Sequence, residues 1–276
     1  MQLDYSAVIW LALALAIVCV FIQKNVIATL FLYSTLCLSV YFERLTIPTG
    51  LGITLLFLIA WKSRYASPRY QFPNSLFIVI CCVALFSHRI PGFENLLVLN
   101  NVETGPESVL FSMYLNLDKP LAFFILLLAH PTLLGVRGAP NYKAITLTSI
   151  PLLCLLPLAV YVGALKFEPS LPVWWWLFAL SNLLFTCVAE EALFRGYLQQ
   201  KLCHRFGAVA GISFASILFG LAHFAGGSLL MIFAALAGLG YGLIFYWSQR
   251  LWVAVFAHFA FNFIHLLFFT YPAAIG

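Results

Sequence analysis

The sequence predicts an all-α protein, a polytopic transmembrane helical bundle of about ten spans (eight to ten). Hydrophobic residues make up 63% of the 276 residues and charged residues only 8%, whereas a soluble domain carries about 25% charged residues. So little charge cannot solvate a fold of this size, so most of its surroundings must be lipid. The apolar residues form long runs without period-two alternation, which argues against a β-barrel. This composition excludes a soluble enzyme, a disordered chain, a collagen and a nucleic-acid-binding domain.

Ten apolar segments account for most of the chain. Since a spanning helix needs about 20 mainly apolar residues, ten of them leave only short connections and no separate soluble domain. The fourth segment is short, and we expect it to extend into its flanks or to be partly re-entrant. The longest connection, 88–118, is expected to form a partly ordered outer cap. The expected spans lie near 5–22, 26–42, 46–61, 75–87, 119–136, 144–164, 171–189, 208–225, 228–248 and 251–270.

The charges of the connections predict an orientation. A basic excess occurs at every odd-numbered connection, such as Lys24 in the first and Arg250 in the ninth, and at no even-numbered one. Because cytoplasmic loops are enriched in Lys and Arg, the odd connections are expected inside and both termini outside. We expect an integral membrane protein of a bacterial inner (plasma) membrane. The net charge of +5 is spread over these loops, which suits orientation signals and not a nucleic-acid partner.

Glu190, Glu191 and Arg195 form the first candidate site. An ionisable residue within a span costs about 2.5–3.5 kcal/mol on insertion scales, so each one is a functional hypothesis. Glu191 and Arg195 are four residues apart on a helix and can pair. Glu190 points about 100° away and is left to act as a general base on water. The alternative is a charged helix end at the membrane surface, with both glutamates solvated.

Two further motifs lie in later spans. Phe219 and His223 share a helix face in Phe219-Gly-Leu-Ala-His223, and the glycines that follow predict a helix end just after His223. His258 and Asn262 share a face in His258-Phe-Ala-Phe-Asn262. A structural histidine near a helix end, and an inter-helix polar contact, are the alternatives. The predicted topology sets Glu190 near the cytoplasmic end of the seventh span and His223 near the outer end of the eighth.

Together the three motifs contain the groups that amide hydrolysis needs. If the spans meet, a carboxylate base, two imidazoles and a carboxamide surround one water-filled pocket. The carboxylate can activate water, and neutral Asn or His donors can hold a developing oxyanion. Such a grouping is unexpected by chance in a chain with so few charges.

At these residues the sequence resembles the CAAX protease and bacteriocin-processing (CPBP) family of intramembrane glutamate-type endopeptidases. The family pattern EExxxR, FxxxH and HxxxN is matched in order over about residues 170–270. The resemblance implies an intramembrane endopeptidase in which Glu190 activates the attacking water and His223 assists it. It also implies that His258 and Asn262 hold the oxyanion. The residues that it implies in support are Glu191, Arg195 and Phe219.

The resemblance leaves the question of a metal open. The chain has no HExxH zinc helix, and the glutamate mechanism needs no cofactor, so we expect none. Zinc is the alternative, because Glu190, His223 and His258 could supply three ligands and leave one position open.

Residues 166–276 are expected to form the catalytic helical core, and residues 1–165 N-terminal transmembrane spans of unknown role. The expected partners are the lipid bilayer and a membrane-associated peptide or protein, for example a lipidated or C-terminal sorting tail. The competing hypothesis is a non-enzymatic membrane transporter, scaffold or immunity protein that uses the same polar pocket. Transporters commonly carry paired broken helices in both halves, whereas these polar residues cluster in one half.

Overall fold

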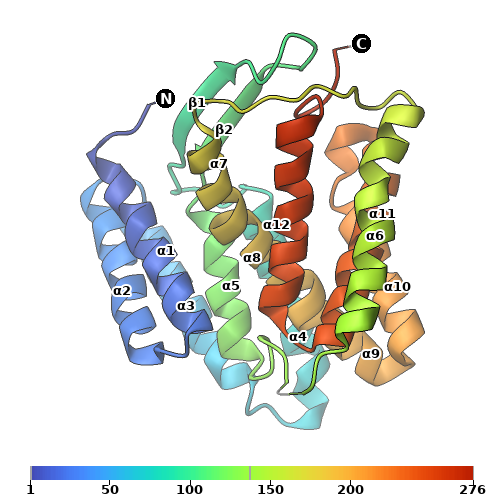
Figure 1. Ribbon diagram of the computed structural model, residues 1–276. Coiled ribbons are helices and arrows are strands. Elements are labelled where there is room, and N and C mark those ends of the chain that lie inside the picture. The colour runs from blue at the N-terminus through green and yellow to red at the C-terminus, as the bar shows by residue number, and fades with distance from the viewer. Residues whose placement is uncertain (1, 137, 276) are drawn as a thin grey trace. The chain divides into compact units, whose positions relative to one another are not determined.

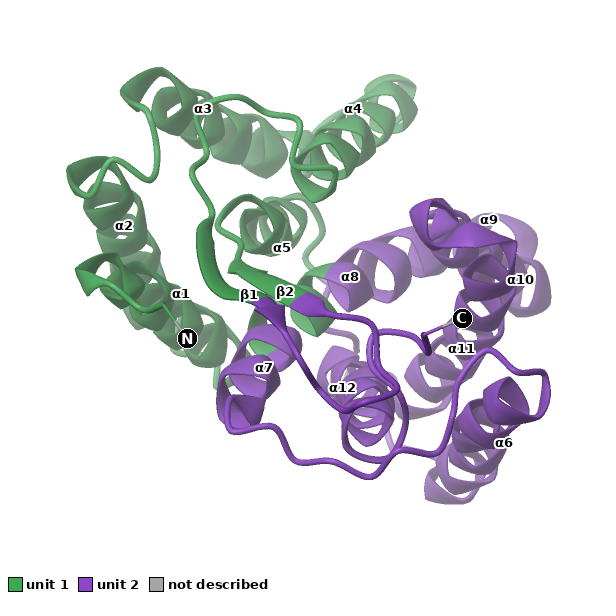
Figure 2. Ribbon diagram, turned by 90° about the horizontal axis from the view of Figure 1, so that it is seen from above, with its two compact units in different colours: residues 1–100, 112–131, 184–189 green, residues 101–111, 132–183, 190–276 purple. Residues whose placement is uncertain are grey.

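The computed structural model describes residues 2–136 and 138–275, and helices occupy all ten expected regions (Figure 1). The chain divides into two compact units (Figure 2). Unit 1 contains the residues up to Asn100 together with 112–131 and 184–189. Unit 2 contains the remaining described residues, among them every candidate site residue.

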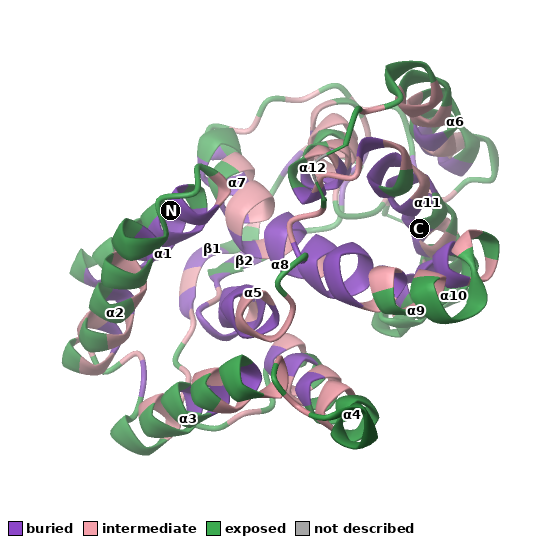
Figure 3. Ribbon diagram, turned by 90° about the horizontal axis from the view of Figure 1, so that it is seen from below, coloured by how far each residue is buried: buried purple, intermediate pink, exposed green. Residues whose placement is uncertain are grey.

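Unit 1 is built around a short buried helix. Leu121, Phe123 and Leu126 of α5 are fully buried, and α5 packs against α3 and α4 (Figure 3). The ring of Phe123 also stacks on Phe21 of α1, with centroids 5.8 Å apart. The short fourth segment extends into its N-terminal flank, as expected. The helices of this unit are α1 (Val8–Phe21, after the 3-10 turn η1, Tyr5–Ala7), α2 (Asn25–Tyr41), α3 (Ile47–Ser63), α4 (Pro68–Phe86) and α5 (Asp118–Ala129).

The chain is mostly helical, as predicted, but two strands that were not predicted form a small sheet in the longest connection. They are β1 (Leu96–Val102) and β2 (Phe111–Leu115). In β2, Met113 and Leu115 are buried while the residues between and before them are exposed. That period of two belongs to a strand with one covered face. The alternation is too short to be apparent beside the long apolar runs.

Unit 2 is organised around α11, which contacts α6, α10 and α12. A continuous helix, Trp175–Phe206, supplies the Glu190 motif and packs on this group through its second half. The separate helices are α6 (Tyr142–Tyr161), α10 (Ala208–Leu221), the 3-10 turn η4 (Phe224–Gly226), α11 (Gly227–Ser248) and α12 (Leu251–Phe268). The long helix consists of α7 (Trp175–Ser181), η2 (Asn182–Cys187), α8 (Val188–Glu191), η3 (Ala192–Gln199) and α9 (Gln200–Phe206).

The expected end of the seventh span near residue 189 was wrong. The helix continues to Phe206 and stops at Gly207, whose φ of +84° suits a glycine. Leu193 and Tyr197 are almost fully buried, so the apolar pattern continues past the glutamates. Glu190 therefore lies in the middle of a 32-residue helix and not at its cytoplasmic end.

Two segments of this helix are π-helical. They are Asn182–Cys187 (η2) and Ala192–Gln199 (η3), and the α-helical turn that carries Glu190 and Glu191 lies between them. π-helical segments are rare and often occur at functional sites. They change the direction in which the side chains of the motif leave the helix.

The helices identify a helical membrane protein. Within residues 2–136 and 138–275, five helices are long and apolar enough to span a bilayer: Pro68–Phe86, Tyr142–Tyr161, Trp175–Phe206, Phe224–Ser248 and Leu251–Phe268. Four shorter apolar helices accompany them: Tyr5–Phe21, Asn25–Tyr41, Ile47–Ser63 and Ala208–Leu221. The span count of eight to ten and the external termini remain predictions.

The core of unit 1 can be tested at Phe123. Replacing it with alanine should lower the free energy of unfolding by about 3–5 kcal/mol, because a buried ring is lost and a cavity is left. The matched change Phe72→Ala, at a ring that is 76% exposed, should cost much less. Thermal unfolding in detergent measures both, and equal losses would contradict a core centred on α5.

Candidate active site

A buried ion pair lies at the centre of unit 2. Arg195 Nη1 is 3.0 Å from Glu191 Oε1, and the two side chains are 1% and 0% exposed. The predicted pairing of these residues is therefore confirmed. Arg195 Nη2 also donates to the backbone oxygen of Gly238 on α11, at 2.9 Å. The guanidinium is thus bonded both to its own helix and to the neighbouring one.

Two aromatic rings complete the environment of Arg195. The guanidinium carbon lies 4.4 Å from the ring centre of Phe219 and 5.3 Å from that of Tyr241. A cation over an aromatic face is attracted by the ring quadrupole, most strongly where water is excluded. Phe219, singled out in the second motif, therefore contacts the cation of the first.

His258 joins the third motif to the same ion pair. Its Nδ1 lies 2.8 Å from Glu191 Oε1, and because an ionised carboxylate can only accept, Nδ1–H is the donor. The imidazole stacks on Tyr241 at 4.5 Å with an interplanar angle of 17°. Glu191 and Tyr241 together fix the orientation of this ring.

Glu190 faces the other nitrogen of His258. The distance from Glu190 Oε2 to His258 Nε2 is 3.9 Å, which is longer than a hydrogen bond. The Glu190 side chain is 12% exposed, compared with 0% for Glu191. The two adjacent carboxylates therefore occupy different environments, and Glu190 has the greater access.

His223 reaches this cluster through Phe219. Its Nδ1 lies 2.8 Å from the Phe219 backbone oxygen, and the two rings are 4.8 Å apart. The ring of Phe219 also contacts His258, at 5.7 Å. We expected this helix to end just after His223, but α10 ends at Leu221, and His223 lies in the turn before η4.

Asn262 contacts a residue that the sequence analysis missed. Its Nδ2 donates to Oδ1 of Asn182, at 3.2 Å. Asn182 is the first residue of the π-helical segment η2. An amide inside an otherwise apolar span was the signal that could have identified it.

The candidate zinc ligands do not form a metal site. Catalytic zinc takes three protein ligands at about 2.0–2.2 Å. Among the described residues, no group of three or more His, Cys, Asp or Glu side chains is placed to hold a metal ion. The donor set Glu190, His223 and His258 therefore does not fit zinc in this arrangement.

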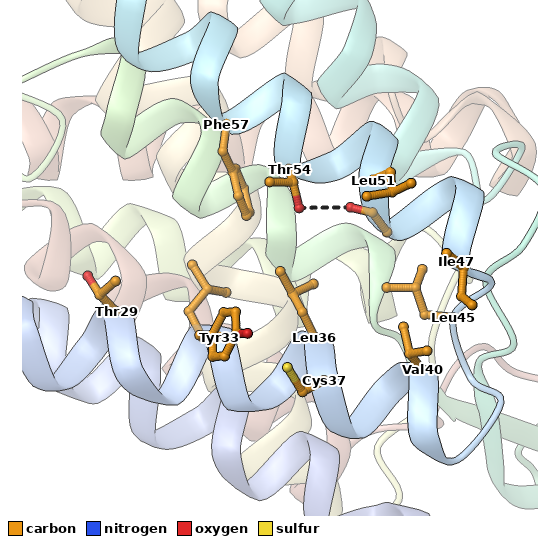
Figure 4. A pocket seen from close by; sticks show the side chains of 12 residues that line it. Thr29, Tyr33, Leu36, Cys37, Val40, Leu45, Ile47, Leu51, Thr54 and Phe57 are labelled. Carbon is orange, nitrogen blue, oxygen red and sulfur yellow. Dashed lines mark hydrogen bonds between the residues drawn. The ribbon is translucent and has the colours of Figure 1, made fainter.

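A groove of about 510 Å³ between α2 and α3 of unit 1 offers no comparable chemistry (Figure 4). Its lining is mainly aliphatic and includes Leu36, Val40 and Leu51. The hydroxyls of Thr29 and Thr54 bond to carbonyls of their own helices. None of the motif residues lines this groove.

The fold and the site define a class, a helical membrane protein with carboxylate, imidazole and guanidinium groups buried together. Residues 172–264, about a third of the chain, match the family described as type II CAAX prenyl endopeptidase Rce1-like. This match confirms the resemblance to the CPBP protease family, and all three motifs lie within it. No curated protein and no solved structure matches the chain.

The contribution of the Glu191 and Arg195 ion pair to stability can be tested by replacing Arg195. Arg195→Met should lower the free energy of unfolding by about 3–5 kcal/mol, because it leaves the Glu191 charge buried without its partner. The double variant Glu191→Leu/Arg195→Met should recover part of this loss.

The control is the exposed pair of Lys166 and Glu107, whose side chains are 50% and 54% exposed. Lys166→Met should cost less than about 1 kcal/mol. Thermal unfolding in detergent compares the three variants. A loss in Arg195→Met no larger than that in Lys166→Met would show that the buried charge is compensated elsewhere.

Proposed function

We propose that the chain is an intramembrane endopeptidase of the glutamate type, which hydrolyses a peptide bond in a membrane-held peptide or C-terminal tail. The observation that carries the proposal is the connected group Glu190, His258, Glu191 and Arg195 within a spanning helix and its neighbour. This group lies in the segment that matches a family of CAAX prenyl endopeptidases. Residues 166–276 would be the catalytic core, with residues 1–165 as accompanying spans.

The charges of this group suit a buried site. Two carboxylates and the permanent charge of Arg195 sum to one negative charge, which a protonated His258 would balance. A neutral cluster is favoured in surroundings of low dielectric constant, where an uncompensated charge is costly. In this form His258 is a charged donor and not the neutral one expected from the sequence, because Nδ1–H is directed to Glu191 and Nε2–H is presented on the side of Glu190.

The proposed reaction uses Glu190 as the base. Its carboxylate takes a proton from water while the water oxygen attacks the peptide carbonyl carbon. The resulting oxyanion accepts hydrogen bonds from His258 Nε2–H and from Asn262. One Nδ2–H of Asn262 is directed to Asn182, so the other Nδ2–H is the proposed donor. The C–N bond then breaks, and the proton on Glu190 passes to the leaving nitrogen. The products are a new carboxyl terminus and a free amine.

The other motif residues would support this reaction. His223 assists in holding the attacking water, while Glu191 and Arg195 fix the orientation of His258. Phe219 contacts Arg195, His223 and His258 and so keeps these groups apart from lipid.

The position of Glu190 within a span favours a substrate that reaches the bilayer. The name of the matched family specifies prenylated CAAX proteins, and for this chain we propose a lipidated or C-terminal sorting tail. A bacterial inner-membrane location and external termini complete the proposal.

Replacing the base tests the reaction. Glu190→Gln should reduce cleavage by about 10²–10⁴-fold, since general base catalysis is lost while the shape is kept. A quenched-fluorescent farnesylated CAAX peptide and terminal proteomics of membranes provide the measurement. Glu94→Gln, at an exposed glutamate of unit 1, is the matched control and should keep full activity.

Cleavage at the wild-type rate in Glu190→Gln would remove the proposed base. A cellular phenotype that persists in this variant, with no terminus changed, would favour a transporter, scaffold or immunity protein.

Metal removal tests the alternative chemistry. Because the proposed glutamate mechanism uses no metal, treatment with 1,10-phenanthroline or EDTA should leave the cleavage rate unchanged. Elemental analysis of the purified protein should find no stoichiometric zinc. Loss of activity on chelation that added zinc restores would instead support a zinc enzyme.

A further inference from the structure

Two side chains of the long helix bond to backbone oxygens of α11 in the same way. Arg195 Nη2 donates to Gly238 at 2.9 Å, and Gln199 Nε2 donates to Gly242 at 2.9 Å. The donors are four residues apart on one helix, and the acceptors are four residues apart on the other. We call these two contacts the backbone clasp. Arg195 belongs to the first motif, whereas Gln199 lies outside all three.

A methyl group on either acceptor residue of the clasp would crowd the side chain that donates to it. A Cβ on Gly242 would lie 2.7 Å from Gln199 Oε1, and a Cβ on Gly238 would lie 3.2 Å from Arg195 Nη2. Small residues four apart let helices approach closely in membranes. Here the space is used by a polar side chain that reaches the neighbouring backbone.

The burial of Gln199 indicates that its hydrogen bond to Gly242 contributes more than packing. The residue is only 2% exposed, and its Oε1 is buried without a hydrogen-bond partner. A buried amide with an unsatisfied oxygen costs free energy that a leucine would not. The adjacent Gln200 differs, because it is only partly buried and bonds to the oxygens of Thr132 and Gly196.

The clasp lies on the π-helical segment that follows the glutamates. Ala192–Gln199 begins directly after Glu191, and Gln199 is its last residue. A π-helical turn is rare and held by its surroundings. Relaxing it to an α-helix by one residue would turn the part before it by about 100°. Such a rotation would move Glu190 away from His258 on α12.

We infer that Gln199 is a positioning residue, whose bond to Gly242 holds η3 in its π-helical register so that Glu190 faces His258. This inference rests on the proposed function, because it assigns Gln199 a part in the same reaction. Gln199 acts through the helix and does not touch the reacting atoms.

The test is a double-variant cycle with two readouts. Gln199→Leu removes the donor, Gln199→Glu keeps its shape, and Gly242→Ala fills the space beside it. Each should lower kcat by about tenfold or more with little change in KM, since small displacements of a catalytic group can cost about 10²-fold. Combining Gln199→Leu with Gly242→Ala should be no worse than either change alone. The substrate is the farnesylated CAAX peptide or the terminus identified by proteomics.

Two matched controls separate positioning from packing. Gln200→Leu removes the neighbouring amide, and Gly240→Ala adds a methyl group to the same helix against the flexible side chain of Leu152. Both should retain kcat. Thermal unfolding is measured on all variants, so that coupling between Gln199 and Gly242 is detected without any activity assay.

The outcomes are distinguishable. An unchanged kcat in Gln199→Leu beside an inactive Glu190→Gln overturns the positioning role and leaves the proposed function intact. Cleavage that persists in Glu190→Gln contradicts the proposed function, and it therefore contradicts the positioning role as well. Additive unfolding free energies for Gln199→Leu and Gly242→Ala overturn the clasp itself, whatever the activity.

Discussion

The buried ion pair between Glu191 and Arg195 is the interaction on which the site depends. Removing two charges from water costs several kcal/mol for each ion, so such a pair needs further bonds in compensation. Here Arg195 also bonds to the Gly238 backbone and lies against Phe219, and Glu191 Oε1 also accepts from His258, whereas Glu191 Oε2 and Arg195 Nε are buried without a hydrogen-bond partner. One electrostatic contact therefore ties the long helix to α10, α11 and α12, and all three motifs converge on it.

Adjacent identical residues acquire different properties from this arrangement. Glu191 is enclosed and bonded to a cation, whereas Glu190 is one position further round the helix and has the greater access. His258 lies between them with one nitrogen toward each carboxylate. Of these two adjacent glutamates, Glu191 is the buried partner of Arg195 and Glu190 is the candidate base. Their different surroundings follow from helical geometry, which points neighbouring side chains in different directions.

Local patterns predicted much of this structure, and each failure has a physical cause. The apolar runs located the helices, and the spacing of four residues predicted the Glu191 and Arg195 pair. The continuation to Phe206 was missed because charge was interpreted as the end of the span, although here Glu191 and Arg195 pair with each other inside the fold. Six to eight residues are too few to separate π-helical from α-helical periodicity. Asn182 and Gln199 were missed because their partners lie 80 and 43 residues away.

Helix lengths have a consequence for the lipid around unit 2. At 1.5 Å per residue, a 32-residue α-helix would be about 48 Å long, whereas α10 with 14 residues measures only about 21 Å. The hydrocarbon core is about 30 Å thick. A 32-residue helix that crosses this core must tilt or project beyond it, and His204 and Arg205 of its last turn are suited to the headgroups. For such a helix, the thickness of the bilayer sets the tilt of the segment that carries Glu190.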